Sequence, residues 1–393
     1  MKQEFNVDRV YFPNLNGLRF IAALSVIVHH IEQEKSDYHL PNIFASPTIQ
    51  LFGELGVVLF FVLSGFLITY LLLEEERSTD TIGIRNFYIR RILRIWPLYF
   101  LIVGLGLLIL PNIPLFTAPG YSTADVYRHL PLKIMFYIFF LPNLVSPLLG
   151  IVPYAAHTWS IGTEEQFYLT WPVILKSIKK NRLLLMFIIV AGYLLIARTL
   201  YSSRTDFLPL KEAISAFWPT FNIDCMAIGG FFAMILHGQN PLLKFFQNKY
   251  LFYFALAFTT FLLYEGIYFP VLMVNHVKFQ YLYKEFYALW FAIIILNFAS
   301  NREILISLES KPLKYLGKIS YGLYMYQPIA IALAFKIAAL FQPVFNLLFY
   351  TLSIAFTILI SAASYKYFES YFLQFKRRFT RIASGDNPSL PGA

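Results

Sequence analysis

Cysteine and charge are both scarce in this chain. One cysteine, Cys225, occurs among 393 residues, which excludes a disulfide framework within a single chain and a thiolate-rich metal site. Only 14% of the residues are charged, against roughly 25% in an ordinary soluble domain. A Gly-x-Ser-x-Gly nucleophile motif is also missing, so the sequence does not indicate a serine hydrolase.

Apolar residues are correspondingly abundant. They make up 58% of the chain, and aromatic residues alone make up 19%. The net charge is +10, but the excess sits in short clusters beside apolar segments, as in the cytoplasmic loops of membrane proteins. We therefore predict an all-α integral membrane protein of the inner (plasma) membrane, in contact with membrane lipid and without a nucleic-acid partner.

The lengths of the apolar segments predict about ten transmembrane helices, and the Lys/Arg bias of the loops places both termini in the cytoplasm. A cytoplasmic segment, 1–16, precedes one membrane domain, 17–372, and a basic, partly disordered cytoplasmic tail, 373–393, follows it. The predicted spans cover about residues 17–33, 50–73, 95–110, 161–176, 183–200, 219–237, 250–267, 282–299, 319–340 and 344–366.

One apolar stretch, 132–150, does not fit a simple crossing. Pro142 and Pro147 interrupt it, and a full crossing would move the lysines that follow the next segment to the outside, against the charge rule. We expect a re-entrant or peripheral half-helix here. Irregular backbone is tolerated at membrane depth only where protein or a water-filled cavity covers it, which suits the wall of a site.

Two ionisable residues stand inside the first apolar segment, GLRFIAALSVIVHH. Charged groups at membrane depth are costly and usually functional. Arg19 and His30 are eleven residues apart, and at about 100° per residue they return to within roughly 20° of one another, with a rise of about 16 Å between them. They therefore share one face of the predicted helix.

The remaining polar residues separate by side of the membrane. Near the predicted inner ends lie Arg19 and the cluster FYIRRILRIWPLYF, and arginine is suited to bidentate recognition of phosphate. Near the outer ends lie His30 and the segment HTWSIGTEEQFYLTWP. Histidine and carboxylate groups can move protons near neutral pH. This arrangement favours a phosphorylated donor on the inside and proton transfer near the outside.

Five ordered segments carry a family resemblance. They are GLRFIAALSVIVHH, GVVLFFVLSGFLI, FYIRRILRIWPLY, HTWSIGTEEQFYLTWP and LGKISYGLYMYQP. In order and spacing the chain resembles membrane acyltransferase family 3 over nearly its whole length. The resemblance implies a ten-helix enzyme that moves an acyl group, commonly acetyl, from cytoplasmic acyl-CoA to a hydroxyl of an extracytoplasmic glycan or a lipid-linked saccharide.

The resemblance also implies roles for single residues. The catalytic candidates are His30, Glu164 and Glu165, and the donor-binding candidates are Arg19, Arg90, Arg91 and Arg94. Candidates for an acceptor or secondary site are His157, Trp159, Asp224, Tyr324 and Gln327. Acyl-CoA is expected as a co-substrate, with no tightly bound cofactor and no metal. The chain departs from the family pattern at Gln327, where a histidine is usual, and after Glu369, where Glu-Arg-Pro is often found.

The residues alone leave alternatives open. His30 acts as a general base or accepts the acyl group transiently, with Glu164 or Glu165 orienting it or shuttling protons. The arginine cluster can instead set topology, the glutamates can cap a helix, and Ser64 and Gly65 can permit close helix contact. A glycan or small-molecule exporter without acyl transfer, or a non-enzymatic scaffold, would also place charges inside a bundle.

Overall fold

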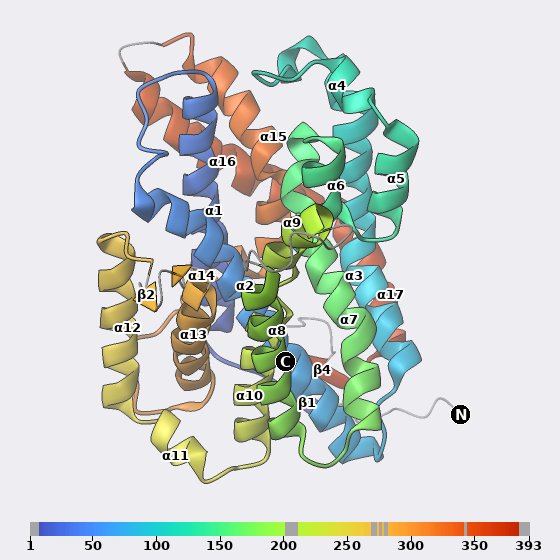
Figure 1. Cartoon of the computed structure of the whole chain (residues 1–393), viewed down its shortest axis with the longest axis vertical. Coiled ribbons are helices and arrows are strands. Elements are labelled where there is room, and N and C mark those ends of the chain that lie inside the picture. The colour runs from blue at the N-terminus through green and yellow to red at the C-terminus, as the bar shows by residue number, and fades with distance from the viewer. Residues whose placement is uncertain are drawn as a thin grey trace.

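The computed structural model is a bundle whose long helices run mostly along its longest axis (Figure 1). It describes residues 8–200, 211–268, 273–274, 277–278, 282–341 and 344–384. The long helices are α1 (Leu15–Asp37), α2 (Pro47–Thr79), α3 (Ile84–Gly104), α7 (Trp159–Ser177), α8 (Arg182–Leu200), α9 (Lys211–Phe221), α10 (Ile223–His237), α12 (Lys249–Tyr264), α13 (Tyr283–Ser300), α15 (Ser320–Ala338) and α16 (Phe345–Ser364). The predicted helical architecture is confirmed, with four short strands beside the helices in the described part of the chain.

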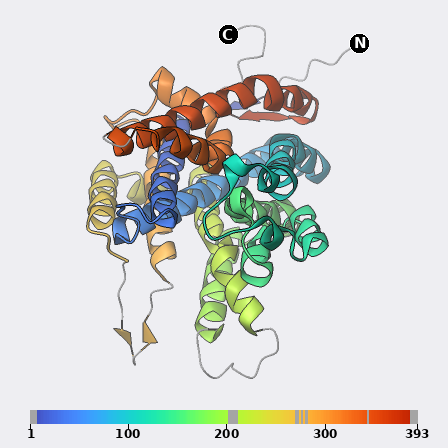
Figure 2. The same ribbon diagram turned by 90° about the horizontal axis from the view of Figure 1, so that it is seen from above.

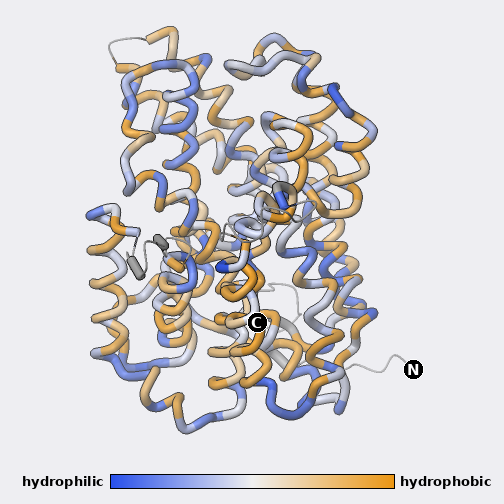
Figure 3. Tube along the Cα trace, in the orientation of Figure 1, coloured by the Kyte–Doolittle hydropathy of each residue, from blue (hydrophilic) through white to orange (hydrophobic). Residues whose placement is uncertain are grey.

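Short elements connect and cover these helices. They are the helices α4 (Thr123–Tyr127), α5 (Leu130–Ile138), α6 (Pro142–Leu149), α11 (Leu242–Phe246), α14 (Lys311–Lys318) and α17 (Ser370–Lys376), the 3-10 turn η4 (Pro153–Thr158), and the strands β1 (Asp8–Val10), β2 (Met273–Val274), β3 (Val277–Lys278) and β4 (Ile382–Ser384). Apolar residues dominate the helices, and hydrophilic residues gather at the connections at both ends of the bundle (Figure 3).

A helix lies in each of the ten predicted segments. Among the described residues, five stretches are long and apolar enough to cross a membrane: Pro47–Thr79, Ile84–Asn112, Arg182–Leu200, Ala213–His237 and Phe345–Phe379. Large apolar side chains stand exposed on α8 and α16, as expected for helices that face lipid; they include Leu184, Phe187, Leu195, Leu347 and Leu359. The number of ten crossings stays a prediction.

The stretch 132–150 is broken into two short helices. The helices α5 and α6 have nine and eight residues, so each is only about 12–14 Å long and too short for a bilayer core of about 30 Å. Phe140 adopts a φ of 55° between them, and Pro142 is the first residue of α6. The interruption that the prolines predict is therefore present.

Helix α2 lies at the centre of the bundle and packs against α1, α10, α13 and α7. Its contact with α10 depends on two glycines that leave no room for a side chain. A Cβ atom at Gly65 would lie 1.9 Å from the carbonyl oxygen of Met226, and one at Gly229 would lie 2.2 Å from that of Val62. The close helix contact predicted at Gly65 is confirmed, because only glycine lets the two backbones approach this closely.

Two distant parts of the sequence meet in a short parallel ladder that the sequence analysis did not predict. Strand β1 pairs with β4, with Asp8 opposite Ile382 and Val10 opposite Ser384. Helix α17 packs against α3, and the predicted domain boundary at 372 falls inside α17. Figure 2 shows the last helices, in red, along one edge of the bundle. The segment after 372 is thus part of the folded domain as far as the described residues extend.

We expect Gly65→Ala to destabilise the protein by about 1–3 kcal/mol, because the new methyl group must displace the backbone of α10. Thermal unfolding of the purified variant in detergent would show this as a lower melting temperature. Gly192→Ala is the matched control, since a Cβ there meets nothing within 4 Å and alanine is the better helix former. Equal melting temperatures for both variants would contradict the role of Gly65.

Candidate active site

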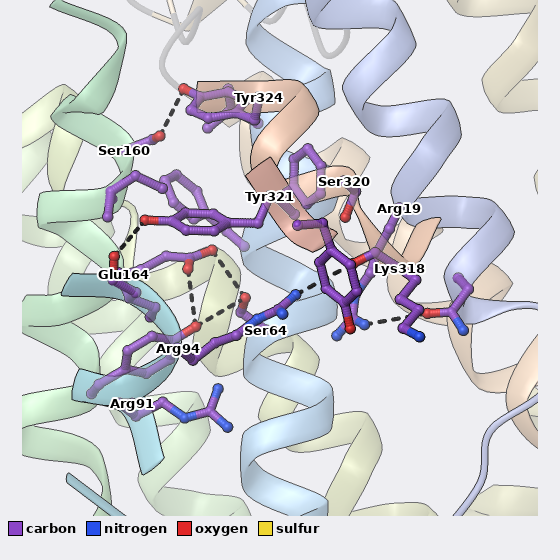
Figure 4. A pocket seen from close by; sticks show the side chains of 18 of the residues that line it. Arg19, Ser64, Arg91, Arg94, Ser160, Glu164, Lys318, Ser320, Tyr321 and Tyr324 are labelled. Carbon is purple, nitrogen blue, oxygen red and sulfur yellow. Dashed lines mark hydrogen bonds between the residues drawn. The ribbon is translucent and has the colours of Figure 1, made fainter. Parts of the chain in front are cut away.

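A polar cavity of about 270 Å³ opens inside the bundle, between α1, α2, α3, α7, α15 and α17. Figure 4 shows Arg91 and Arg94 at one end of it and Ser160 and Tyr324 at the other. Five cationic side chains line the cavity: Arg19, Arg91, Arg94, Lys318 and Lys376. Among the lining residues only Glu164 carries a carboxylate. The cavity wall therefore has a large excess of positive charge.

The three arginines of the cavity have neutral groups as their hydrogen-bond and ring partners, with Glu164 and Glu369 within electrostatic reach. The Arg91 guanidinium lies 5.7 Å from the ring of Phe87 and 5.6 Å from that of Tyr168, and its buried Nε has no hydrogen-bond partner. An amino group of Arg94 donates to the carbonyl oxygen of Lys318 over 3.5 Å. Arg19 makes an equally long bond to the side-chain oxygen of Asn16. Such weak partners leave donors available to an anionic ligand.

Arg90 lies apart from the other predicted arginines. Its guanidinium donates to Oε2 of Glu75 over 3.1 Å and to the carbonyl oxygen of Phe379 over 2.8 Å. It lines a small adjoining pocket together with Glu75 and Thr380, and it is not among the residues of the main cavity. The structure thus brings Arg19, Arg91 and Arg94 together and gives Arg90 a carboxylate partner of its own.

The carboxylate of Glu164 is fixed by two hydroxyl groups. Ser64 donates to its Oε1 over 3.0 Å, and Tyr168 donates to its Oε2 over 3.0 Å. The hydroxyl of Tyr168 also lies 3.3 Å from that of Ser64. Sequence analysis assigned Ser64 to helix packing and missed this network. Two sequence features could have indicated this network: a lone hydroxyl in an apolar helix, and the i, i+4 spacing of Glu164 and Tyr168.

Glu165 and Trp159 point elsewhere. Glu165 accepts a hydrogen bond of 3.0 Å from the indole Nε1 of Trp96, and its other carboxylate oxygen is buried without a partner. Trp159 packs edge-on against Phe61, with 6.2 Å between ring centres. Neither residue lines the cavity. The two acids diverge because consecutive residues of a helix point about 100° apart.

Two further cations of the site were not predicted. Lys318 ends α14, and Lys376 ends α17; both line the cavity. The sequence pattern placed Lys376 in a cytoplasmic tail, because basic clusters after a last span usually lie there. Only the packing of α17 against α3 brings it to the arginines.

His30 lies just outside the cavity, in a layer of polar residues behind its closed end. Its Nδ1 is 3.3 Å from Oε1 of Gln327. The Nε2 of His157 bonds to the carbonyl oxygen of Met325 over 3.1 Å. Figure 4 shows the Ser160 and Tyr324 hydroxyls that close this end, 2.7 Å apart.

The cavity that holds the arginines does not reach His30 in this structure. Ser160 and Tyr324 lie at the end of the cavity opposite Arg91 and Arg94 (Figure 4), and His30 is not among the lining residues. Tyr324 also donates to the carbonyl oxygen of His157 over 2.8 Å, which anchors its ring across the route. Gln327 follows Tyr324 by about one helical turn, so His30 and its partner lie directly behind this closure.

Asp224 belongs to a different part of the bundle. It is buried in α10, within electrostatic reach of Glu285 of α13, and the thiol of Cys225 contacts it at 3.7 Å. It does not line the cavity, so its contacts are those of helix pairing. Within the described residues, no cluster of three or more His, Cys, Asp or Glu side chains could hold a metal ion.

Comparison with known proteins now identifies the family. Residues 12–366 match the family described as the acyltransferase domain. The chain belongs to this acyltransferase family. Over 386 residues it is 27% identical to the Listeria monocytogenes "Peptidoglycan O-acetyltransferase OatA", covering 94% of this chain and 57% of that protein. Over 382 residues it is 25% identical to the Bacillus subtilis "Putative peptidoglycan O-acetyltransferase YrhL", covering 91% of this chain and 54% of that protein.

The chain spans a little over half the length of these two relatives. No solved structure matches the chain. The match covers every cavity residue from Asn16 to Tyr365 and leaves Leu373 and Lys376 outside it.

We expect Tyr168→Phe to lower the free energy of unfolding by about 1.5–3 kcal/mol, because the variant removes one hydrogen bond to a buried carboxylate. Thermal unfolding in detergent would report the loss. Tyr264→Phe is the control, since Tyr264 is 78% exposed. If both variants melt with the wild type, the Glu164 network does not stabilise the fold.

Proposed function

We propose that this protein is an O-acyltransferase that moves an acyl group, in the first instance acetyl, from cytoplasmic acyl-CoA to a hydroxyl of a glycan on the far side of the membrane. Membership of the acyltransferase family and relatives named peptidoglycan O-acetyltransferases support the reaction class. The proposed donor is inferred from the cavity, which is lined by five cationic side chains and one carboxylate. Family membership also favours an enzyme over an exporter or a scaffold.

Acyl-CoA fits the charge of this cavity. Its phosphate groups are anionic, and Arg19, Arg91 and Arg94 offer planar donors that match phosphate oxygens. In the proposal these arginines, with Lys318 and Lys376, hold the phosphorylated end. The narrow arm of the donor then extends along α1 toward His30, about 16 Å from Arg19 by helix rise. Phe60 and Tyr324 must move aside for the thioester to reach the imidazole.

His30 is the proposed centre of the chemistry. Because Oε1 of Gln327 can only accept, it orients the ring with the proton on Nδ1 and the lone pair on Nε2. Gln327 thereby supports the histidine without titrating itself. Glu164, held by Ser64 and Tyr168, lies between the arginines and this layer and is the carboxylate proposed to shuttle protons for the reaction.

Two routes use that lone pair. In one, Nε2 takes the proton of the acceptor hydroxyl while its oxygen attacks the thioester carbonyl, the C–S bond breaks, and the proton passes to the CoA thiolate. In the other, Nε2 attacks the carbonyl itself, the C–S bond breaks, and the CoA thiolate takes the Nδ1 proton of the acylated ring. The acceptor hydroxyl then attacks the acyl carbon, the N–C bond breaks, and the hydroxyl proton returns to the imidazole. Mass spectrometry after a single turnover without acceptor separates the routes, because only the second leaves an acyl adduct on His30.

The membrane arrangement completes the proposal. The ladder between β1 and β4 places the two described ends of the chain on one side, which we assign to the cytoplasm of the cell bounded by the inner (plasma) membrane. The arginines lie toward that side and His30 toward the other, so donor and acceptor approach from opposite faces.

We expect Arg94→Ala to weaken the binding of CoA about tenfold or more, because it removes charge-assisted hydrogen bonds to phosphate. Isothermal titration of CoA into the purified protein measures this directly. Arg85→Ala is the matched control, since Arg85 lies exposed on the same helix. CoA affinity that is unchanged in Arg94→Ala, or reduced equally in both variants, would contradict the donor site.

We expect His30→Ala to reduce transfer of acetyl from acetyl-CoA at least about 100-fold while CoA binding persists, because only the reacting base or nucleophile is lost. The assay follows acetylated glycan by mass spectrometry. His129→Asn is the control, since His129 lies exposed in a left-handed turn that asparagine also accepts. Full transfer by His30→Ala would refute the proposed mechanism.

A further inference from the structure

A second cavity, of about 130 Å³, adjoins the cavity that holds the arginines. Its walls are the segment 10–19, which includes the start of α1, and one face of α2, with a contribution from α3 and α7. We call it the N-terminal pocket. Five residues line both cavities: Asn16, Arg19, Ser64, Arg91 and Tyr168. A ligand whose charged groups lie at the arginines can therefore extend into this pocket.

The N-terminal pocket extends from the arginines in the direction away from His30. Helix α2 runs antiparallel to α1, because Gly53 packs on His29 whereas Gly56 packs on Ser25. Later residues of α2 therefore lie progressively further from His30. The pocket residues of α2 follow Gly56 by 8 to 15 residues, which is a rise of about 12–22 Å. The pocket thus lies toward β1, on the side that we assign to the cytoplasm.

The lining that belongs to the N-terminal pocket alone is almost wholly apolar. It consists of Tyr11 and six apolar side chains, among them Phe12 and Leu67. The ring of Phe12 packs edge-on against Phe66 and Tyr70, with 5.5 and 4.8 Å between ring centres, so its plane is fixed. An apolar recess with a few polar groups at one end is typical of a small-ligand site.

The N-terminal wall of the pocket is anchored to the loop before α14. The hydroxyl of Tyr11 donates to Oε2 of Glu309. The side chain of Asn14 accepts from the amide of Leu308 over 2.7 Å and donates to the carbonyl oxygen of Phe298 over 3.2 Å. The ladder between β1 and β4 holds the same segment from its other end. These bonds fix the wall, so the pocket is formed before a ligand enters.

The size of the pocket suits a flat, bicyclic ring. A cavity that admits one water needs about 10–15 Å³, so about 130 Å³ admits on the order of ten water-sized groups. An adenine ring has about ten non-hydrogen atoms and two apolar faces, which stack well on aromatic and aliphatic side chains. The volume and the apolar walls therefore match a purine base.

We propose that the N-terminal pocket binds the adenine ring of the acyl-CoA donor. The inference rests on the proposed function and assigns a site to one further part of the donor. In acyl-CoA the base and the thioester stand at opposite ends, with the phosphate groups and the narrow arm between them. With the phosphates at the arginines and the thioester directed toward His30, the base lies on the opposite side of the arginines, where this pocket is.

The residues shared by the two cavities join the base to the phosphates. Arg19 and Arg91 line both, and their planar guanidinium groups can donate to phosphate oxygens or stack on a base. The buried Nε of Arg91 has no hydrogen-bond partner in the described structure, which leaves a donor at this junction. The acyl group, the other apolar part of the donor, lies near His30 and does not compete for the pocket.

The test compares CoA with 4′-phosphopantetheine, which keeps the arm and one phosphate but lacks the adenosine. Isothermal titration measures both on the full chain in nanodiscs. We expect Leu67→Trp to weaken CoA binding about tenfold or more, because the indole occupies the place of the base, and to leave 4′-phosphopantetheine binding unchanged. Leu195→Trp is the matched control, since Leu195 is 63% exposed on α8. Unchanged CoA affinity in Leu67→Trp, or an equal loss for both ligands, overturns the inference.

A second measurement uses the wild type alone. CoA that carries a photoreactive azide on carbon 8 of its adenine is irradiated with the protein, and mass spectrometry identifies the labelled peptides. We expect the label in the segments 10–19 or 64–71, and excess CoA should suppress it. Labelling confined to other segments overturns the inference although CoA binds. If CoA neither binds in the titration nor suppresses the label, the proposed donor itself is refuted and the inference falls with it.

Discussion

Positive charge buried in an apolar bundle is the constraint on which the rest of this structure depends. Removing a guanidinium from water costs several kcal/mol unless an anion compensates it. Arg91 rests on aromatic rings, and Arg19 and Arg94 make hydrogen bonds of 3.5 Å to neutral oxygens. Glu164 and Glu369 lie within electrostatic reach of these arginines, so two carboxylates face a larger number of cations. In the proposed function, a bound polyanion compensates the remaining positive charge.

The closed end of the cavity answers a second requirement of a membrane protein. A water-filled path from the arginines through His30 to the outer end of α1 would cross the bilayer and let ions and protons leak. The ring of Tyr324, anchored to Ser160 and to the backbone of His157, stands between the arginine cavity and the layer that holds His30. In the proposed mechanism, donor and acceptor occupy opposite sides of this ring, and its movement joins them.

Local features of the chain could be predicted from sequence because they depend on short-range geometry. Helix periodicity placed Arg19 and His30 on one face of α1, Pro142 predicted a break, and Gly65 predicted a close helix contact. The same geometry explains why Glu164 and Glu165 cannot both face one cavity, since their side chains diverge by about 100°. Features that depend on helix geometry alone could therefore largely be predicted from the sequence.

Features that depend on contacts between distant segments could not be predicted in this way. The pairing of β1 with β4 and the packing of α17 on α3 have no periodic signature. Lys376 was consequently predicted to lie in the cytoplasmic tail. Arg90 was predicted to bind the donor together with Arg94, although its charge is neutralised by Glu75. The partner of a side chain, more than its type, decided which charges belong to the site.

The cavity is assembled from the first long helix and from one of the last. Arg19 comes from α1, whereas Leu373 and Lys376 come from α17, and more than 350 residues must be inserted between them. During synthesis the arginines of α1 and α3 therefore enter the membrane long before their enclosure exists. The cavity is complete only when α17 has been made, so in the proposed function a nascent chain that stops early lacks part of the donor site.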